Sequence, residues 1–474
     1  MRRRLSRLTT RWLAAGLFCA AAGTALAQAL PPAVMQALAQ AQVPAQHMAV
    51  VVQPVDGGAP RLQAQADVPM NPASLMKLVT TTAALELLGP AYTWPTPVWL
   101  DGRVRNGTLD GSLVIQGTGD PKLVLERVWL LLRRVQQAGV QRIRGDIVLD
   151  RSAFATPAGR PADFDGEPLK PYNVQPDALL LNHKAVVYTF TPEPERRRAR
   201  VSAEPALAGV MLPATVRLDA GPCEDWRTQL QASFEPPRVR FRGSYPAACG
   251  ERQWPVAFPE ADRYNARLLQ ALWREMGGTL RGTVRDGAAP ADRAPSFVVS
   301  SPPLADVVRD INKFSNNVMA QQLFLTLGAA RAGSGTPEAA RQVVQQWLAE
   351  RFGPAAGGTV LDNGSGLSRE QRTTARLLAR LLLHAYAGPT MPELMSSLPV
   401  SAQDGTLRRM QGAPGRAHLK TGSLRDVAGI AGYVLGASGK RYVLVALIHD
   451  PQAPAARGAL DALVQWTYDD TPVP

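Results

Sequence analysis

Residues 71–77 read Asn71-Pro72-Ala73-Ser74-Leu75-Met76-Lys77, and a mostly apolar run follows from 78 to 88. An Asn that can cap a helix, a Pro at the first helical position and a Gly-Pro stop at 89–90 predict a helix across this run. Ser74 and Lys77 are three positions apart, so they would share one face of that helix. Because apolar residues occupy nearly every side of it, we expect the helix to be buried.

A buried lysine beside a serine indicates nucleophilic chemistry. Burial disfavours the charged form of lysine and lowers its pKa, so the amine can accept a proton from a neighbouring hydroxyl. Arginine cannot lose its proton in this way, and only seven of the 52 basic residues are lysine. Ser74 also lies in the first turn, where free backbone N–H groups favour a developing oxyanion. The sequence therefore predicts Ser74 as nucleophile and Lys77 as its general base.

Two further motifs strengthen this prediction, because Ser-x-x-Lys alone is a weak signal. Ser315-Asn316-Asn317 is the single Ser-x-Asn in the chain, and Lys420-Thr421-Gly422 is the single Lys-Thr-Gly. Ser-x-x-Lys also occurs once, and it precedes both. This order of the three motifs is typical of penicillin-recognising serine enzymes.

The flanking sequence places both later motifs at the borders of secondary structure elements. Residues 302–313 and 318–327 read as helices, so the Ser-x-Asn motif falls at a helix–helix junction. Residues 427–434 and 441–448 are apolar runs around a Gly-containing turn, which predicts a hairpin of buried strands. The segment from Lys420 to Ser423 would lie on a strand leading into this hairpin, at a sheet edge to which a substrate backbone can add.

On these motifs the chain resembles the D-alanyl-D-alanine carboxypeptidase/endopeptidase family, the low-molecular-mass class C penicillin-binding proteins. The resemblance covers essentially the whole chain after residue 27. Further stretches resemble family signatures, namely Gln116-Gly117-Thr118-Gly119-Asp120-Pro121, Pro171-Tyr172-Asn173-Val174, Gly364-Ser365-Gly366-Leu367-Ser368-Arg369, Asp404-Gly405-Thr406-Leu407 and Lys420-Thr421-Gly422-Ser423-Leu424.

The resemblance implies hydrolysis of D-Ala-containing wall peptides through an acyl-enzyme. Ser74 would attack the peptide carbonyl while Lys77 takes its proton, and backbone N–H groups of Ser74 and Ser423 would stabilise the oxyanion. Ser315 would relay a proton to the leaving amine, and Asn317 would hold the substrate amide. Water would then release the acyl group, whereas a β-lactam would acylate Ser74 and leave slowly.

The resemblance also implies how the carboxyl end of the substrate is held. Lys420 would supply positive potential, Thr421 would bind the terminal carboxylate, and Gly422 and Ser423 would line the same strand. The partners would be peptidoglycan peptides and, as acylating inhibitors, β-lactam antibiotics. A β-lactamase or esterase on the same fold, and a catalytically silent peptidoglycan-binding protein, remain as alternatives.

Residues 164–173 resemble a family segment that folds back over the active site. Wall peptides in many bacteria carry a zwitterionic side chain that ends in an amine and a carboxylate. Asp165 would bind the amine, and Arg369 would bind the carboxylate as a fork. Tyr172 would form a wall of the same pocket. A loop acid that is merely solvated, and an arginine that holds a turn, are the alternatives.

The spacing of the motifs predicts a divided catalytic domain. Ser315 follows Ser74 by 241 residues, whereas Lys420 follows Ser315 by only 105. A large, mainly β insertion at about residues 97–297 would therefore interrupt the domain. We expect an α+β, penicillin-recognising fold with an antiparallel sheet between helices, built from residues 28–96 and 298–474.

Residues 1–27 predict a secretory signal peptide. Five arginines precede a short apolar stretch, and Ala25-Leu26-Ala27 fits a cleavage site, so the mature chain would begin at Gln28 in the periplasm. No later segment is apolar enough to span a membrane.

Export places Cys223 and Cys249 in an oxidising compartment, where a disulfide between them is the leading interpretation and two free thiols are the alternative.

Composition argues against several other classes of function. The formal net charge is +13, of which five charges lie in residues 1–27, and no basic patch with interleaved aromatics indicates a nucleic-acid partner. The five histidines are scattered and Cys-x-x-Cys is missing, so we expect no metal and no cofactor. No Gly-x-Ser-x-Gly surrounds a serine, and His449 and Asp450 are merely adjacent, which argues against a Ser-His-Asp hydrolase.

Overall fold

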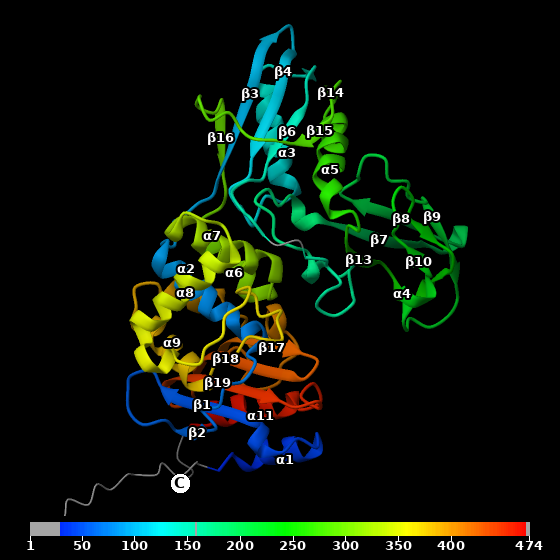
Figure 1. Cartoon of the computed structure of the whole chain (residues 1–474). Helices are drawn as coiled ribbons and strands as arrows, with labels where there is room; N and C mark the ends of the chain where they lie inside the picture. Colours follow the sequence, from blue (N-terminus) through cyan, green and yellow to red (C-terminus); the bar gives the residue numbers. More distant parts are fainter. Residues whose placement is uncertain (1–28, 157–158, 471–474) are drawn as a thin grey trace, which may run out of the picture.

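The computed structural model describes residues 29–156 and 159–470 (Figure 1). The predicted signal peptide, residues 1–27, and the predicted mature N-terminus at Gln28 lie outside the described residues. The two ends of the described chain meet in one layered body, and the middle of the chain forms further sheets beside it (Figure 1). Within the described part, the model contains no helix with the length and apolar character that a membrane crossing requires.

A five-stranded antiparallel sheet joins the two ends of the chain. Its order is β17-β18-β19-β1-β2, which puts β17 at an edge. Strand β1 pairs with β19 from Met48 opposite Ile448 to Pro54 opposite Tyr442. The predicted hairpin is present as β18 and β19. The strands are β1 (Met48–Pro54), β2 (Leu62–Ala64), β17 (Ala417–Leu424), β18 (Val427–Leu435) and β19 (Arg441–His449).

Helices cover both faces of this sheet, because its strands carry apolar side chains on both faces. Along β1, Ala49 and Val51 pack into one core, whereas Val50 and Val52 pack into a second core on the other side. This architecture confirms the predicted α+β class. The helices of the first core are α2 (Met76–Leu87), α6 (Leu304–Phe314), α7 (Asn317–Ala332), α8 (Pro337–Phe352), α9 (Ala375–Ala387) and α10 (Met391–Ser397), and those of the second are α1 (Pro32–Gln40) and α11 (Arg457–Tyr468).

The middle of the chain begins and ends on one sheet. Its first strand, β3 (Pro95–Arg105), pairs with its last strand, β16 (Phe297–Ser300), so this segment leaves and rejoins the helical layers at one place (Figure 1). Helices α3 (Leu125–Gln137) and α5 (Ala261–Glu275) contribute to its core. The other strands are β4 (Thr108–Gln116), β5 (Arg142–Ile143), β6 (Ile147–Asp150), β14 (Thr279–Leu280) and β15 (Val284–Asp286).

A second sheet of the middle segment holds the disulfide. An aromatic cluster packs against this sheet, and in it the Phe190 and Tyr245 rings stack with centroids 5.4 Å apart. Cys223 and Cys249 are joined by a disulfide, as the sequence favours. The sheet order is β12-β9-β8-β7-β13, with β7 (Ala185–Glu193), β8 (Arg198–Glu204), β9 (Thr215–Asp219), β12 (Ser244–Pro246) and β13 (Arg252–Ala257), and a separate pair is formed by β10 (Ala232–Ser233) and β11 (Arg240–Phe241).

Replacing Cys223 and Cys249 by serine should destabilise the sheet that they fasten by about 3 kcal/mol, because the bond closes a loop with a sequence separation of 26. The cysteines pack in a core separate from the one that surrounds Ser74, so penicillin acylation should persist. Calorimetry and acylation assays on the double variant test both statements. Loss of acylation in parallel with loss of stability would contradict the second.

Candidate active site

Ser74 lies on a strained turn ahead of a buried helix. A single 3₁₀ turn, η2 (Ala73–Leu75), precedes α2, which begins at Met76. Ala73 has a φ of 46°, a left-handed conformation that L side chains rarely adopt. Gly366 approaches so closely that a Cβ there would lie 2.1 Å from the Ala73 carbonyl oxygen. The close approach of Gly366 holds the turn in this conformation, and Ser74 remains partly exposed.

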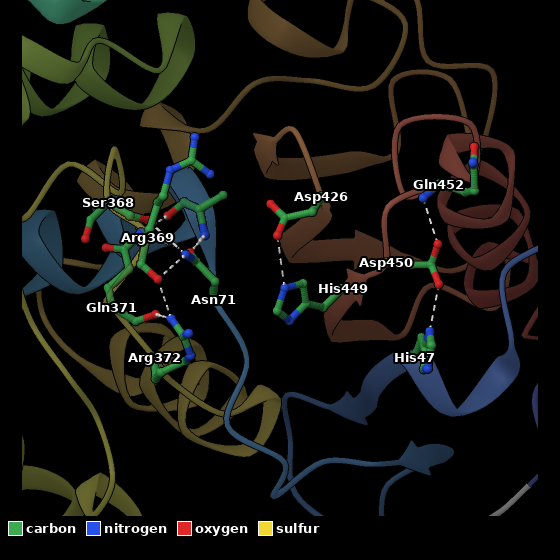
Figure 2. Close-up of polar contacts among 11 residues, drawn as sticks. His47, Asn71, Ser368, Arg369, Gln371, Arg372, Asp426, His449, Asp450 and Gln452 are labelled. Atoms are coloured by element: carbon green, nitrogen blue, oxygen red, sulfur yellow. Dashed lines mark hydrogen bonds and ion pairs between the residues drawn. The ribbon is translucent and has the colours of Figure 1, made fainter. Parts of the chain in front are cut away.

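The start of the helix differs from the sequence expectation. The sequence predicts Asn71 as the cap of the α-helix, but its Oδ1 accepts a hydrogen bond from the Ala73 backbone N–H at 2.9 Å, at the entry to the 3₁₀ turn that precedes the helix. Asn71 Nδ2 donates to the Ser368 carbonyl oxygen at 2.8 Å, and Gln371 Nε2 donates to Asn71 Oδ1 at 3.2 Å (Figure 2). The expected burial is confirmed, because every residue from Met76 to Leu85 is buried.

The Lys77 amine is enclosed by oxygen atoms. Its side chain is 0% exposed, and Nζ lies 2.9 Å from Ser74 Oγ, 2.7 Å from Asn317 Oδ1 and in contact with the Ser365 carbonyl oxygen. The amide and peptide oxygens can only accept hydrogen bonds. A neutral amine has two N–H groups for these two acceptors, and its lone pair then faces the Ser74 hydroxyl. This geometry allows the hydroxyl to donate its proton to Lys77.

Burial favours the neutral form of this amine. It lowers the pKa of Lys77 well below its ordinary value, and the positive charge of Lys420 lowers that pKa further. Burial also lowers the pKa of Lys420 to about 7. Two buried ammonium groups in one site repel each other, so we infer that the pair shares one positive charge near neutral pH.

The Ser-x-Asn motif lies at the helix–helix junction that the sequence predicts. Ser315 ends α6 with a left-handed φ of 55°, and the Asn316 side chain caps α7. Asn317 is the first residue of α7 and directs its Oδ1 to Lys77. The Ser315 hydroxyl accepts a hydrogen bond from Lys420 Nζ at 2.8 Å. The motif therefore contacts both buried lysines.

Strand β17 brings the Lys-Thr-Gly motif to the sheet edge. Lys420 is 0% exposed, and its Nζ also donates to the Thr421 carbonyl oxygen at 2.7 Å. A Cβ at Gly422 would lie 2.7 Å from the Pro72 carbonyl oxygen, so a larger residue would push the strand away from the turn that carries the serine. Ser423 follows as an exposed residue near the end of the strand.

A hollow of 410 Å³ opens along this edge. Thr406 lies in it and accepts a hydrogen bond from the Thr421 hydroxyl at 2.8 Å. Neither Thr406 nor Ser365 was expected as a site residue from the sequence. Both stand in stretches that resemble the family, but the Lys77 contact of Ser365 is made by its backbone carbonyl, which leaves no side-chain pattern. The predicted residues that line the hollow are Ser74, Ser315, Thr421, Gly422 and Ser423.

The segment expected to fold back over the site does contact it. The Asn317 side chain donates a hydrogen bond to the Tyr172 carbonyl oxygen at 3.4 Å. The Tyr172 hydroxyl donates to Asp165 at 2.8 Å, and Asn173 Nδ2 donates to the same carboxylate at 2.7 Å. Burial raises the pKa of Asp165, but the hydrogen bonds outweigh it and lower that pKa overall. Asp165 is therefore an ionised carboxylate held by the tyrosine.

Arg369 lies near this segment but does not pair with Asp165. Its guanidinium is over the Phe164 ring, 5.1 Å from the ring centroid. Figure 2 shows the Arg369 side chain pointing away from Asn71, whereas its backbone lies beside Asn71. Asp165 and Arg369 thus remain separate charges. Tyr172 holds Asp165, and Arg369 stacks on Phe164.

Three of the histidines lie beside carboxylates, and His384 Nε2 lies 2.6 Å from Glu86. His47 lies 2.7 Å from Asp450, and His449 lies 3.3 Å from Asp426 (Figure 2). Among the described residues, no histidine ring hydrogen-bonds to a serine hydroxyl, so the Ser-His-Asp alternative has no supporting geometry. Within the same ranges, no group of three or more His, Cys, Asp or Glu is placed to hold a metal ion.

The three motifs meet at one edge of an antiparallel sheet between helices, which defines a penicillin-recognising serine enzyme. A model described as the D-Ala-D-Ala carboxypeptidase 3 (S13) family matches residues 30–469. The chain belongs to this family. The match confirms the resemblance that its motifs indicate.

Similar proteins carry the same description. The D-alanyl-D-alanine carboxypeptidase of Actinomadura sp. (strain R39) is 32% identical over 415 residues, which cover 81% of this chain and 74% of that protein. DacB of Haemophilus influenzae is 25% identical, with 80% of each chain covered. The crystal structure of penicillin-binding protein 4 (dacB) from Haemophilus influenzae matches with a TM-score of 0.73 at 22% identity, covering 92% of this chain and 99% of that one. This structural likeness shows a shared fold.

The pair of buried lysines predicts a bell-shaped pH dependence of acylation by a β-lactam. The rate should fall toward acid pH, because a protonated Lys77 could not act as the predicted base for Ser74. It should fall again as pH rises through about 7, where Lys420 loses the charge that is predicted to attract the β-lactam carboxylate. Stopped-flow acylation rates from about pH 5 to about pH 10 test this, since free lysines titrate near 10.4. A rate that still rises at the alkaline end would contradict it.

Proposed function

We propose that this protein is a serine-type D-Ala-D-Ala carboxypeptidase and endopeptidase, which trims stem peptides and cleaves cross-links of peptidoglycan through an acyl-enzyme on Ser74. Family membership supports the activity. One observation carries the choice of nucleophile: the Ser74 hydroxyl lies 2.9 Å from a fully buried Lys77 amine whose other two partners are carbonyl oxygens. Burying a lysine destabilises a fold, so its place beside a hydroxyl favours catalysis over silent binding.

In the proposed reaction, Lys77 takes the proton of Ser74 as Oγ attacks the carbonyl carbon of the penultimate D-Ala or of a cross-link. Backbone N–H groups of Ser74 and Ser423 stabilise the oxyanion. Ser315, which contacts Lys420, relays to the leaving amine the proton that Lys77 has taken, as the C–N bond breaks. Water then attacks the ester and releases the peptide.

The exposed edge of β17 supports a bound substrate strand. In this proposal, Thr421 and the charge of Lys420 hold the carboxylate of the leaving group, and Asn317 holds the amide of the acyl part. Gly422 leaves space for the scissile bond above the serine. A β-lactam imitates this arrangement, and the penicillin-binding protein 4 of Haemophilus influenzae has been solved in complex with a β-lactam.

We also propose where this reaction takes place and which parts of the chain carry it out. The signal-peptide pattern of residues 1–27 favours the periplasm. Residues 28–96 and 298–474 form the catalytic domain, and residues 97–297 form the insertion. The pairing of β3 with β16 supports this division, because it brings the two ends of the insertion together.

Ser74→Ala should abolish the covalent penicillin adduct, which intact mass spectrometry should find once per chain of the natural protein. Lys77→Arg should slow acylation about 100- to 10,000-fold, because arginine stays protonated and so cannot act as a base. Lys440→Arg is the matched control, since it makes the same change at an exposed position. A labelled Ser74→Ala protein would refute the nucleophile, and near-normal acylation of Lys77→Arg would refute the base. Rapid release of the adduct would favour the β-lactamase alternative.

Asp165→Ala should reduce kcat/KM on peptides with the zwitterionic side chain by a factor equivalent to about 1–3 kcal/mol, because their amine loses its carboxylate partner. Acylation by simple penicillins, which lack that side chain, should barely change. Asp163→Ala serves as the control on the same loop, since Asp163 pairs with Arg160. Arg369→Ala should behave like Asp165→Ala. Equal losses on both kinds of substrate would show that Asp165 supports the fold and not a subsite.

A further inference from the structure

The hollow beside Ser74 continues beyond the residues used in the proposed reaction. The segment after Thr406, strand β18 and the helix α11 also line it, and all of this lies within the 410 Å³. The volume of this hollow falls within the range of about 300–1,000 Å³ that is usual for ligand sites. One alanine would fill only a part of it. The additional lining residues are Leu407, Arg409, Met410, Ala428, Gly429, Ile430, Arg457, Leu460 and Asp461.

Two unpaired cations dominate this extension. Arg409 and Arg457 are exposed, and neither forms an ion pair with another residue in the part of the chain that the structure describes. Asp461 lines the same wall, and burial raises the pKa of its carboxyl group. With Asp461 ionised, the extension still presents two positive charges and one negative charge, so it favours an anionic ligand.

The floor of the extension is apolar. Met410 and Leu460 line it and belong to the core between the sheet and α11. The extension therefore offers hydrocarbon surface together with the two guanidinium groups. A ligand that starts at Thr421 and fills it would combine a methylene chain with carboxylates.

This step rests on the proposed function. Given that function, the chemistry of the leaving group decides which ligand can fill the extension. Thr421 holds the carboxylate next to the bond that breaks, so the extension lies on the leaving-group side. A free stem peptide releases D-alanine, which has only a methyl group beyond that carboxylate. A cross-link releases an amine whose carbon carries a methylene chain and then a whole second peptide, with further carboxylates.

We propose that this extension, lined by Arg409, Met410, Arg457 and Leu460, is a subsite for the second peptide of a cross-link. The methylene chain lies on Met410 and Leu460, and carboxylates of the second peptide bind the two guanidinium groups. The subsite selects cross-linked over free stem peptides. Arg409 and Arg457 therefore determine the balance between endopeptidase and carboxypeptidase activity.

The experiment compares two defined muropeptides. One is a dimer of two tetrapeptides, in which the cross-link is the only D-Ala bond of the required kind. The other is a monomeric pentapeptide, which ends in D-Ala-D-Ala. Chromatography of the products gives kcat/KM for each, and the benzylpenicillin acylation rate reports on Ser74 and Lys77 independently of either peptide.

The key variant is Arg409→Ala with Arg457→Ala, and the matched control is Arg408→Ala, an exposed neighbour that does not line the hollow. In the double variant, kcat/KM on the dimer should fall about tenfold or more, because two charge-assisted contacts are lost. On the monomer it should change less than about twofold, and benzylpenicillin acylation should be unaffected. Added salt should weaken dimer cleavage by the natural protein more than monomer cleavage.

Three results would overturn the subsite. They are equal losses on dimer and monomer, an unchanged rate on the dimer, or a natural protein that cleaves the monomer but not the dimer. Arg408→Ala must match the natural protein on both substrates, and a selective loss of dimer cleavage there would also refute the assignment. A natural protein that is acylated by benzylpenicillin but cleaves neither peptide would instead refute the proposed function.

Discussion

Enclosure of the Lys77 amine, away from water, is the constraint on which the rest of the active site depends. A charged ammonium at a 0% exposed position needs compensation, and its oxygen partners carry no formal charge. The neutral amine satisfies the same contacts without that penalty, and this form is the one that the proposed role of Lys77 as a base for Ser74 requires. The burial that packs the helix therefore also favours the proposed chemistry.

Several remote segments must converge to keep that enclosure closed. Helix α2 lies in the large core beneath the sheet, α7 supplies Asn317, and the segment at Ser365 supplies a carbonyl oxygen. The glycines at 366 and 422 allow that same segment and strand β17 to approach the serine turn closely. Ala73 and Ser315, which belong to or contact this site, have left-handed backbone conformations, as backbone strain often clusters at functional sites.

The sequence predicted the parts of the site that side chains encode. The motifs predicted that Ser74 and Lys77 share a helix and that the Ser-x-Asn motif lies between two helices. The apolar runs predicted the hairpin and the buried helix. All of these features depend on local sequence pattern. The contact from Ser365 and the 3₁₀ turn after Asn71 were not predicted. A backbone carbonyl has no residue signature, and an alanine in a left-handed conformation is held there by distant segments, which local propensity does not record. The roles of the site residues stay predictions.

A titration of the lysine side chains tests the central claim most directly. The chain has only seven lysines, so carbon-labelled lysine should give a simple NMR spectrum in which the Lys77 Cε signal is identified by its loss in Lys77→Arg. Burial and the nearby charge of Lys420 predict that this signal titrates well below the ordinary value. A Lys77 signal that titrates near about 10.4, as lysines in water do, would show a permanently charged amine and contradict the account.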